Sequence, residues 1–472
     1  MTWRTNVGVA NLIRPFIKQK EITLATRNVK RGPTEASTTV QQTTRVTHVS
    51  ADVESLMLAA LEGGRDGATT GRYIMTFKEG ATDAGMKHLE SKAGFRMANA
   101  RDFAHQAVVF EEAGDADCVV FPEIGVALIG GQAAAARNMT VESVIAEDSP
   151  VHSIDPEYFM FAGGINAGDY MKGVLHTAQM ISMDLGGLEG LEEAQVTPTV
   201  LGVTWGLAAC KVPTSMRDGN GIKVAVLDTG FDLGHPEFAG RPFVTNSFVG
   251  QPIQDLVGHG THTAGTACGP KTPPGAIQRY GIGFKTQIFV GKVLNNSGSG
   301  TQAQVLAGMN WAIANKCPVI SMSLGAQIPV QPSYTAAGAA ALANGCLIIA
   351  AAGNASQRPG NIQPAGAPAN SPTVMSVAAV DNALRVAVFS CGGKVDIAGP
   401  GVDVFSSWPR PVLHKTISGT SMATPHVAGC AALWAQTDPT LRGAALRAKI
   451  FTSAKALPLP ASDVGAGLVQ AP

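Results

Sequence analysis

Three side chains in the C-terminal half of the chain have the types that nucleophilic catalysis requires. Asp228 follows the apolar run KVAVL, His259 lies between glycines in DLVGHGTHTAGTACG, and Ser421 lies in ISGTSMATPHVAG. A serine hydroxyl is barely ionised at neutral pH, so it needs a base that takes its proton. That base needs an acidic partner that holds its tautomer and stabilises the imidazolium. These three residues can supply a nucleophile, a base and an orienting acid for acyl transfer.

The segments around these residues predict how the chain positions them. Beyond Lys223, the apolar runs KVAVL, QIFVGKVL, PVISMSL and CLIIAAA alternate with the helical segments THTAGTA, TQAQVLAGMNWAIANK and SYTAAGAAALANG. This alternation is typical of parallel βαβ units with helices on both faces of the sheet. Ligands of such sheets bind at the carboxyl ends of the strands, where Asp228 is expected. We expect His259 and Ser421 at the starts of helices, with Pro425 tolerated near the first turn.

The sequence around the three residues resembles the signature segments of the subtilisin-like serine proteases, the subtilase family. AVLDTG, GHGTHTAGT and GTSMATPHVAG carry the resemblance, which continues through NWAIANKCPVISMSLG and AAAGNAS and covers roughly residues 200–472. It implies an α/β fold with a mostly parallel sheet and helices on both faces. It also implies a serine endopeptidase in which Asp228 is the orienting acid, His259 the general base and then acid, and Ser421 the nucleophile.

The same resemblance implies the groups that bind the substrate. Asn354, in AAAGN, matches the family's oxyanion-hole asparagine, whose amide and the Ser421 N–H could donate to the developing oxyanion. Ser323, Leu324, Gly325, Ala351, Ala352 and Gly353 match the walls of the first specificity pocket, and Gly298, Ser299 and Gly300 match the segment that pairs with an extended substrate. We therefore expect a peptide to bind as an added β-strand.

The chain before the catalytic domain is expected to hold a leader and a small module. Residues 1–70 are rich in Thr, Ser, Gln and charge, which predicts a flexible leader. Residues 71–162 predict a compact βαββαβ module with strands YIMTF, CVVF, VALIG and ESVIAED. This module is similar to the ferredoxin-like α+β pro-domains of subtilases, which act as inhibitors and intramolecular chaperones.

The pro-domain resemblance implies a precursor that inhibits itself and is cleaved autocatalytically. The tail within residues 151–164 is expected to cross the active-site cleft as a product would, and self-cleavage is expected there. Residues 163–200 mix glycine with a weakly helical acidic stretch and predict a connector. The catalytic domain is then expected over residues 201–472.

Composition and charge narrow the range of partners. The chain has 472 residues, 45% of them hydrophobic, which suffices for two or three domains with their own cores. Its 35 Lys and Arg balance 35 Asp and Glu, so no general positive field attracts phosphates, and nucleic acid is not an expected partner. No stretch reaches the roughly 18 consecutive apolar residues of a membrane span. The expected partners are a protein or peptide substrate and the chain's own pro-domain.

No cofactor is required by this chemistry, and metal sites receive little support. Many subtilases bind calcium through a loop after the histidine helix, but GPKTPPGAIQRYGIG at that position contains no Asp or Glu; calcium sites elsewhere stay open. His259 and His262 form an HxxH pair without a third ligand, so His262 is expected to be structural. Asp232, His235 and Asp255 are expected to be solvated or to cap turns.

The cellular location has two interpretations. The N-terminus lacks an uninterrupted apolar secretory segment, and the seven cysteines are dispersed without a CxxC pair, which favours the cytoplasm. A pro-domain usually accompanies secreted relatives, so secretion by a non-classical route is the alternative.

Two other functions are compatible with the same residues. A peptide ligase, cyclase or esterase would use the same triad and differ only in the nucleophile that reaches the acyl-enzyme. A non-catalytic peptide-binding protein with a permanently docked pro-domain is disfavoured, because binding alone does not need a nucleophile, a base and an oxyanion donor together.

Overall fold

The computed structural model describes residues 47–62, 68–137, 139, 148–163 and 202–472. The expected connector over 163–200 lies outside the described residues except for Gly163. The expected strand ESVIAED also lies outside them, apart from its last residue.

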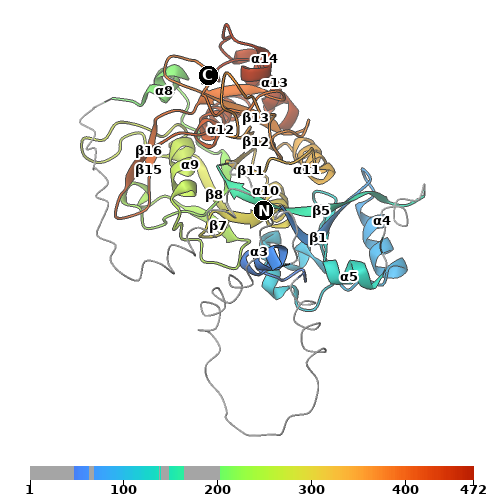
Figure 1. The fold of residues 1–472 in the computed structure, drawn as a ribbon. Helices are drawn as coiled ribbons and strands as arrows, with labels where there is room; N and C mark the ends of the chain where they lie inside the picture. Colours follow the sequence, from blue (N-terminus) through green and yellow to red (C-terminus); the bar gives the residue numbers. More distant parts are fainter. Residues whose placement is uncertain (1–46, 63–67, 138, 140–147, 164–201) are drawn as a thin grey trace, which may run out of the picture.

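A parallel sheet forms the centre of residues 202–472 (Figure 1). In spatial order its seven described strands are β14 (Ile397–Pro400), β13 (Met375–Val380), β12 (Leu347–Ala351), β10 (Val319–Met322), β6 (Lys223–Asp228), β8 (Gln287–Lys292) and β7 (Phe243–Ser247). Every pairing between neighbours in this sheet is parallel. The expectation of a parallel α/β sheet is confirmed.

Helices cover both faces of this sheet. The larger ones are α9 (His259–Cys268), α10 (Gln302–Ala314), α11 (Pro332–Ala343), α12 (Thr420–Thr437) and α13 (Gly443–Ser453); α8 (Trp205–Ala209) and α14 (Ala461–Val464) are short. Alternate residues of a strand point to opposite faces. In β6, Ala225 and Leu227 pack in the core that contains α10 and α11, whereas Val224 and Val226 pack in the core that contains α9 and α12. Buried on both faces, the strands need the continuous apolar runs seen in the sequence.

A second, mainly antiparallel sheet builds the N-terminal unit. Its elements are β1 (Thr69–Phe77), α4 (Thr82–Lys87), a π-helical turn (His88–Lys92), β2 (Met97–Asn99), β3 (Cys118–Phe121), β4 (Val126–Ile129), α5 (Gly131–Ala136) and β5 (Val151–Ala162). Short 3₁₀ turns at Ala100–Asp102, Ala104–Gln106 and Phe110–Ala113 lie between β2 and β3. The strands follow the order β5-β1-β4-β3-β2, and β2 and β3 pair in parallel.

The flexible leader expected over residues 1–70 is wrong for its described part. Helix α3 (Val53–Glu62) buries Val53, Leu56, Met57 and Ala60 against Phe159 and Phe161 of β5. Val49 is also fully buried. The apolar residues of this helix repeat at helical spacing and pack onto a strand about a hundred residues later. The N-terminal unit therefore begins at least as early as residue 47.

Strand β5 gives the expected C-terminal tail of the small module a regular structure. Residues 151–162, within the tail expected over 151–164, form the longest strand of the unit and pair with β1. The far end of β5 then joins two short strands from residues 202–472, β9 (Ser299–Thr301) and β11 (Leu324–Gly325). Figure 1 shows β5 reaching from the N-terminal unit toward α10 and β11.

A hairpin of β15 (Val404–Ser407) and β16 (His414–Ile417) packs on the side of α9 (Figure 1). All seven cysteines fall within the described residues, and all are buried and unpaired. Within the described part of the chain, no helix has the length and apolar character to cross a bilayer.

Candidate active site

Asp228 and His259 meet at the carboxyl end of β6. The Asp228 carboxylate is fully buried, and its Oδ1 lies 2.7 Å from Nδ1 of His259. The backbone N–H of Thr229 also donates to Oδ1 at 2.8 Å, and the Thr263 hydroxyl donates to Oδ2 at 3.2 Å. Because an ionised carboxylate only accepts, Nδ1 of His259 carries the proton. The other ring nitrogen, Nε2, is thereby left free to act as a base.

The surroundings of His259 favour its protonated form. Burial opposes the charge on the ring, but the charge and hydrogen bond of Asp228, with a further contribution from the charge of Asp255, raise the pKa of His259 above its ordinary value. A raised pKa makes the imidazole a stronger base for a hydroxyl proton.

Ser421 lies in the first turn of α12, with 1% of its surface exposed. Its hydroxyl donates to the carbonyl oxygen of Ser323 at 3.1 Å. Nε2 of His259 is buried and has no hydrogen-bond partner among the described residues. The structure therefore joins Asp228 to His259 but does not show a hydrogen bond between His259 and Ser421.

A proline shapes the backbone next to Ser421. Pro425 lies inside α12 and has no N–H to donate to the carbonyl of Ser421, four residues earlier. The hydroxyl of Ser323 donates to that carbonyl at 2.7 Å instead. Ser323 and Ser421 are thus joined by two hydrogen bonds, and the expected pocket residue Ser323 directly contacts the expected nucleophile.

Asn354 follows β12, and its side-chain amide has a defined orientation. Its Oδ1 accepts from the backbone N–H of Thr420 at 2.9 Å and from the Thr420 hydroxyl at 2.8 Å. The amide nitrogen must therefore point the other way, and it donates to the carbonyl oxygen of Gly163 at 2.5 Å. Gly163 is the residue that follows β5.

The end of β5 lies between the two edge strands that the sequence assigned to substrate binding. The register pairs Phe159, Met160 and Phe161 with Thr301, Gly300 and Ser299 of β9, and Phe161 and Ala162 with Gly325 and Leu324 of β11. The N–H of Ala162 donates to the carbonyl of Gly298 at 2.8 Å. The three positions expected to pair with an extended peptide, 298–300, and the expected pocket residues 324–325 thus contact a segment of the chain itself.

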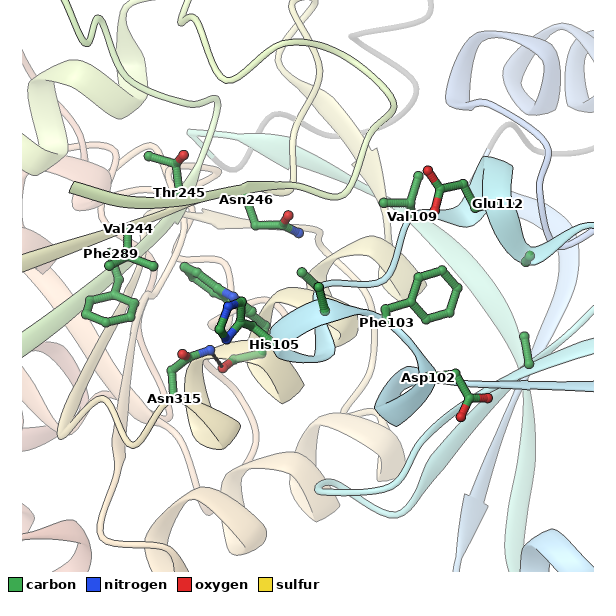
Figure 2. A pocket seen from close by; sticks show the side chains of 15 residues that line it. Asp102, Phe103, His105, Val109, Glu112, Val244, Thr245, Asn246, Phe289 and Asn315 are labelled. Atoms are coloured by element: carbon green, nitrogen blue, oxygen red, sulfur yellow. Dashed lines mark hydrogen bonds between the residues drawn. The ribbon is translucent and has the colours of Figure 1, made fainter.

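The remaining expected pocket residues line one small cavity beside this strand. Ala351, Ala352 and Gly353 share it with Leu324 and Gly325, and Ala326, Gln327, Gly366 and Ala367 complete it. The lining is dominated by small side chains. A larger cavity of about 870 Å³ lies elsewhere, between the N-terminal unit and β7, and contains none of the expected site residues (Figure 2). Figure 2 shows Asp102, His105 and Glu112 spread around that cavity rather than converging.

Three charged residues near the site are fully buried. Asp232 and Asp255 were expected to be solvated or capping; neither is solvated, and both accept from backbone N–H groups as caps do, Asp232 from that of Gly234. Asp232 pairs with Arg410 at 2.8 Å, and Asp255 accepts hydrogen bonds from the start of α9. Lys292 at the end of β8 is also fully buried. An acid just before a predicted helix is a local signal of a helix start, and could have drawn attention to Asp255.

Metal ligands do not gather in the described residues. No group of three or more His, Cys, Asp and Glu side chains suitable for a metal occurs among them. Nε2 of His262 lies 3.0 Å from the Val404 carbonyl oxygen, which can only accept, so this nitrogen carries a proton and has no lone pair for a metal; burial lowers the pKa of His262 to about 3. In the loop after α9, the guanidinium of Arg279 donates to the carbonyls of Gly281 and Ile282, so a calcium ion does not fit this stretch.

The parallel α/β fold and the Asp228–His259 pair at the end of β6 are compatible with a hydrolase that uses a histidine base, and comparison with known proteins identifies the class. The subtilase family profile matches residues 219–467, and the chain belongs to this family. It is 36% identical over 259 residues to a subtilisin of Bacillus pumilus, covering 53% of this chain and 91% of that protein. It is 36% identical over 288 residues to an alkaline protease of Alkalihalobacillus alcalophilus, covering 59% and 72%. The protein is a subtilisin-like serine peptidase.

Proposed function

We propose that Asp228, His259 and Ser421 are the catalytic triad of this serine endopeptidase. Nε2 of His259 takes the hydroxyl proton while Ser421 Oγ attacks the peptide carbonyl, and the proton then passes to the departing amine. A water molecule hydrolyses the acyl-enzyme by the same route. The unpartnered Nε2 supports this proposal, because α9 and α12 pack against each other and this nitrogen is not engaged by any other group of the described residues.

The hydrogen bond from Asn354 to Gly163 is the strongest support for this proposal. It indicates where a substrate carbonyl oxygen would lie, next to an oriented amide donor and near the N-terminus of α12, whose second residue is Ser421. A donor at this point stabilises the oxyanion more than the ground-state carbonyl. Residues 160–163 then occupy the positions of a cleaved product, with Gly163 at the carbonyl that is attacked.

We also propose that residues 47–163 form an inhibitory unit of a self-processed precursor. Arg72 and Glu157, both almost fully buried, pair at 2.6 Å, and Glu157 Oε1 also accepts from the N–H of Ala303 at the start of α10. Arg72 further donates to the carbonyl of Val49 at 3.0 Å. Because these charges are removed from water, the pair holds together the N-terminal segment, β1, β5 and α10. This supports a unit that blocks the cleft until it is cleaved and released.

The cavity beside β5 supports a preference for small residues before the cleaved bond. Its free volume is only about 10 Å³, although glycine and alanine dominate its walls, and Asn354, which binds the Gly163 carbonyl, directly follows Gly353 of this lining. We propose that peptides with Gly or Ala at this position are cleaved faster than peptides with Phe or Arg.

Labelling with a fluorophosphonate probe tests the triad. The processed enzyme should be labelled at Ser421, and Ser421→Ala should lose both labelling and peptide hydrolysis, by about 10⁶-fold in kcat. Ser418→Ala is the matched control, because Ser418 lies three residues away and only accepts from the Asp403 N–H. Hydrolysis by Ser421→Ala at the wild-type rate would refute the triad.

The cellular location stays a prediction from the sequence. The seven buried, unpaired cysteines support a reducing compartment, and we propose the cytoplasm. Fractionation of cells that express the full chain tests this, and recovery of the enzyme mainly in the medium would contradict it.

A further inference from the structure

Asp255 is a buried carboxylate next to the base that the proposed mechanism does not yet use. It lies four residues before His259, and none of its surface is exposed. Among the described residues it forms no ion pair within 4.0 Å, although burial of an unpaired carboxylate is costly. Its charge must therefore be stabilised by hydrogen bonds.

Five hydrogen bonds reach this carboxylate from three segments. Oδ1 accepts from the Thr229 hydroxyl at 2.9 Å, from the N–H of Val257 at 3.0 Å and from the N–H of Gly258 at 2.8 Å. Oδ2 accepts from the N–H and the hydroxyl of Thr261, both at 2.8 Å. One side chain thus supplies the cap that α9 otherwise lacks, since Gly258 precedes the helix and has no side chain to cap it.

The Thr229 hydroxyl extends this network to the other side of His259. It accepts from the N–H of Gly260 at 2.9 Å while donating to Asp255. Thr229 also follows Asp228 directly, and its N–H donates to the Asp228 carboxylate. The residues before and after His259 are therefore both tied, directly or through one hydroxyl, to the same carboxylate, as is the residue next to Asp228.

We propose that Asp255 is a positioning residue for catalysis, which holds the backbone on both sides of His259 so that its ring stays aligned between Asp228 and the nucleophile. This inference rests on the proposed triad. A shift of about 1 Å in such a group can cost a hundredfold in rate, because proton transfer requires hydrogen-bond distances.

Charges around His259 provide a readout that a purely structural role would not change. Asp228 on β6 and Asp255 before α9 both favour the imidazolium. Lys292 on β8 contacts the carbonyl of Thr229, and burial lowers its pKa to about 8. Burial also lowers the pKa values of His262 on α9 and His426 on α12, to about 3 and about 4, so both are neutral during activity. Removal of the Asp255 charge should therefore lower the pKa of His259, and the fall of activity on the acidic side of the pH profile should move to lower pH.

The test compares Asp255→Asn, Thr229→Val and Thr229→Ser in the enzyme that the full chain produces. Hydrolysis of a peptide p-nitroanilide is followed for kcat, KM and the pH dependence of kcat/KM. Asp255→Asn should lower kcat at least about tenfold with KM nearly unchanged and should shift the acid limb to lower pH. Thr229→Val should lower kcat without shifting the pH profile. Thr229→Ser keeps the hydroxyl and should therefore keep kcat near the wild-type value.

Thr266→Val is the matched control on the same helix, because the Thr266 hydroxyl is buried but donates only to the carbonyl of His262. It should leave kcat per labelled active site unchanged. Wild-type kcat and pH profile in folded Asp255→Asn would overturn the proposal. If that variant does not fold, wild-type kcat in Thr229→Val would do so, and failure of both to fold would mean that the role is structural only. The proposed triad is tested separately, by the activity of Ser421→Ala.

Discussion

The side-chain amide of Asn354 donates to the carbonyl oxygen of Gly163 at 2.5 Å, although 190 residues separate them in the chain. The contact aligns the end of β5 with the side chain that we propose as the oxyanion donor. The backbone pairing of β5 with β9 and β11 fixes the same register independently. Two separate sets of contacts thus hold the end of β5 in one register, with the Gly163 carbonyl at Asn354.

The processing bond follows from this register. We expect the chain to cleave itself between Gly163 and Gly164, because the Gly163 carbonyl is the one held by Asn354. N-terminal sequencing of the processed enzyme should read from Gly164, and mass spectrometry should recover an N-terminal fragment that ends at Gly163.

The Ser421→Ala chain is the control for this prediction. It should remain uncleaved when purified under the same conditions, since the bond is cut by its own active site. Normal processing of that variant would mean that another peptidase makes the cut, and a different new N-terminus in the wild type would contradict the register.

Loss of the oxyanion donor should affect kcat far more than KM. Asn354→Ala removes an amide that gains strength only as charge develops, so kcat should fall about 10²- to 10³-fold, or about 3 kcal/mol. Steady-state kinetics on a peptide substrate measure this. Asn344→Ala, at the exposed end of α11, is the control and should keep wild-type kcat. An equal rise in KM with unchanged kcat would show that Asn354 binds substrate without stabilising the transition state.

The raised pKa of His259 predicts the acid limb of the pH profile. Only the neutral imidazole takes the serine proton, so kcat/KM should fall as the pH drops through a value above the ordinary 6.5. The same shift stabilises the folded state below pH 6.5, and this contribution disappears as the pH rises through the folded-state pKa. Asp228→Asn should move the limb to lower pH and lower kcat by about 10⁴-fold.

A carboxylate far from the site controls for general charge effects on this limb. Asp463 pairs with Arg358 on another part of the domain. Asp463→Asn should leave the acid limb where it is in the wild type. An unshifted limb in Asp228→Asn would contradict the role of Asp228 in raising the pKa of His259.

Helix α3 should strengthen self-inhibition. Leu56 is fully buried against the face of β5 that carries Phe159 and Phe161, and Glu54 accepts from Asn295 of the catalytic domain at 2.8 Å. Leu56→Ala should weaken the docking of the N-terminal unit on the rest of the chain by about 2–5 kcal/mol. Peptidase activity should therefore appear after a shorter lag. A time course of peptide hydrolysis by the full chain measures this.

The exposed Glu62 at the end of the same helix supplies the matched variant. Glu62→Ala should leave the lag unchanged, because its side chain does not contact β5. Equal lags for Leu56→Ala and the wild type would show that α3 has no part in inhibition.

Local signals explain which elements the sequence could predict. The continuous apolar runs at β6, β8, β10 and β12 reflect burial on both faces, so these strands were found within a residue or two of their ends. Helix α3 was missed because its short apolar pattern lies in a polar segment, and its partner strand is distant in the chain. Strand β5 was not predicted as a strand, since it is defined by pairing with β1 and not by its own composition.

The sequence by itself determined the family, the parallel sheet and the residues expected to react, because these depend on residue types and short spacings. Only the tertiary structure decided that β5 pairs with β9 and β11 with Gly163 at Asn354, that Ser421 donates to Ser323, and that Asp255 is buried and bonded to the backbone beside His259. These relationships depend on torsion angles and on contacts between segments far apart in the chain. Burial and register are properties of the packed molecule, so no local pattern specifies them.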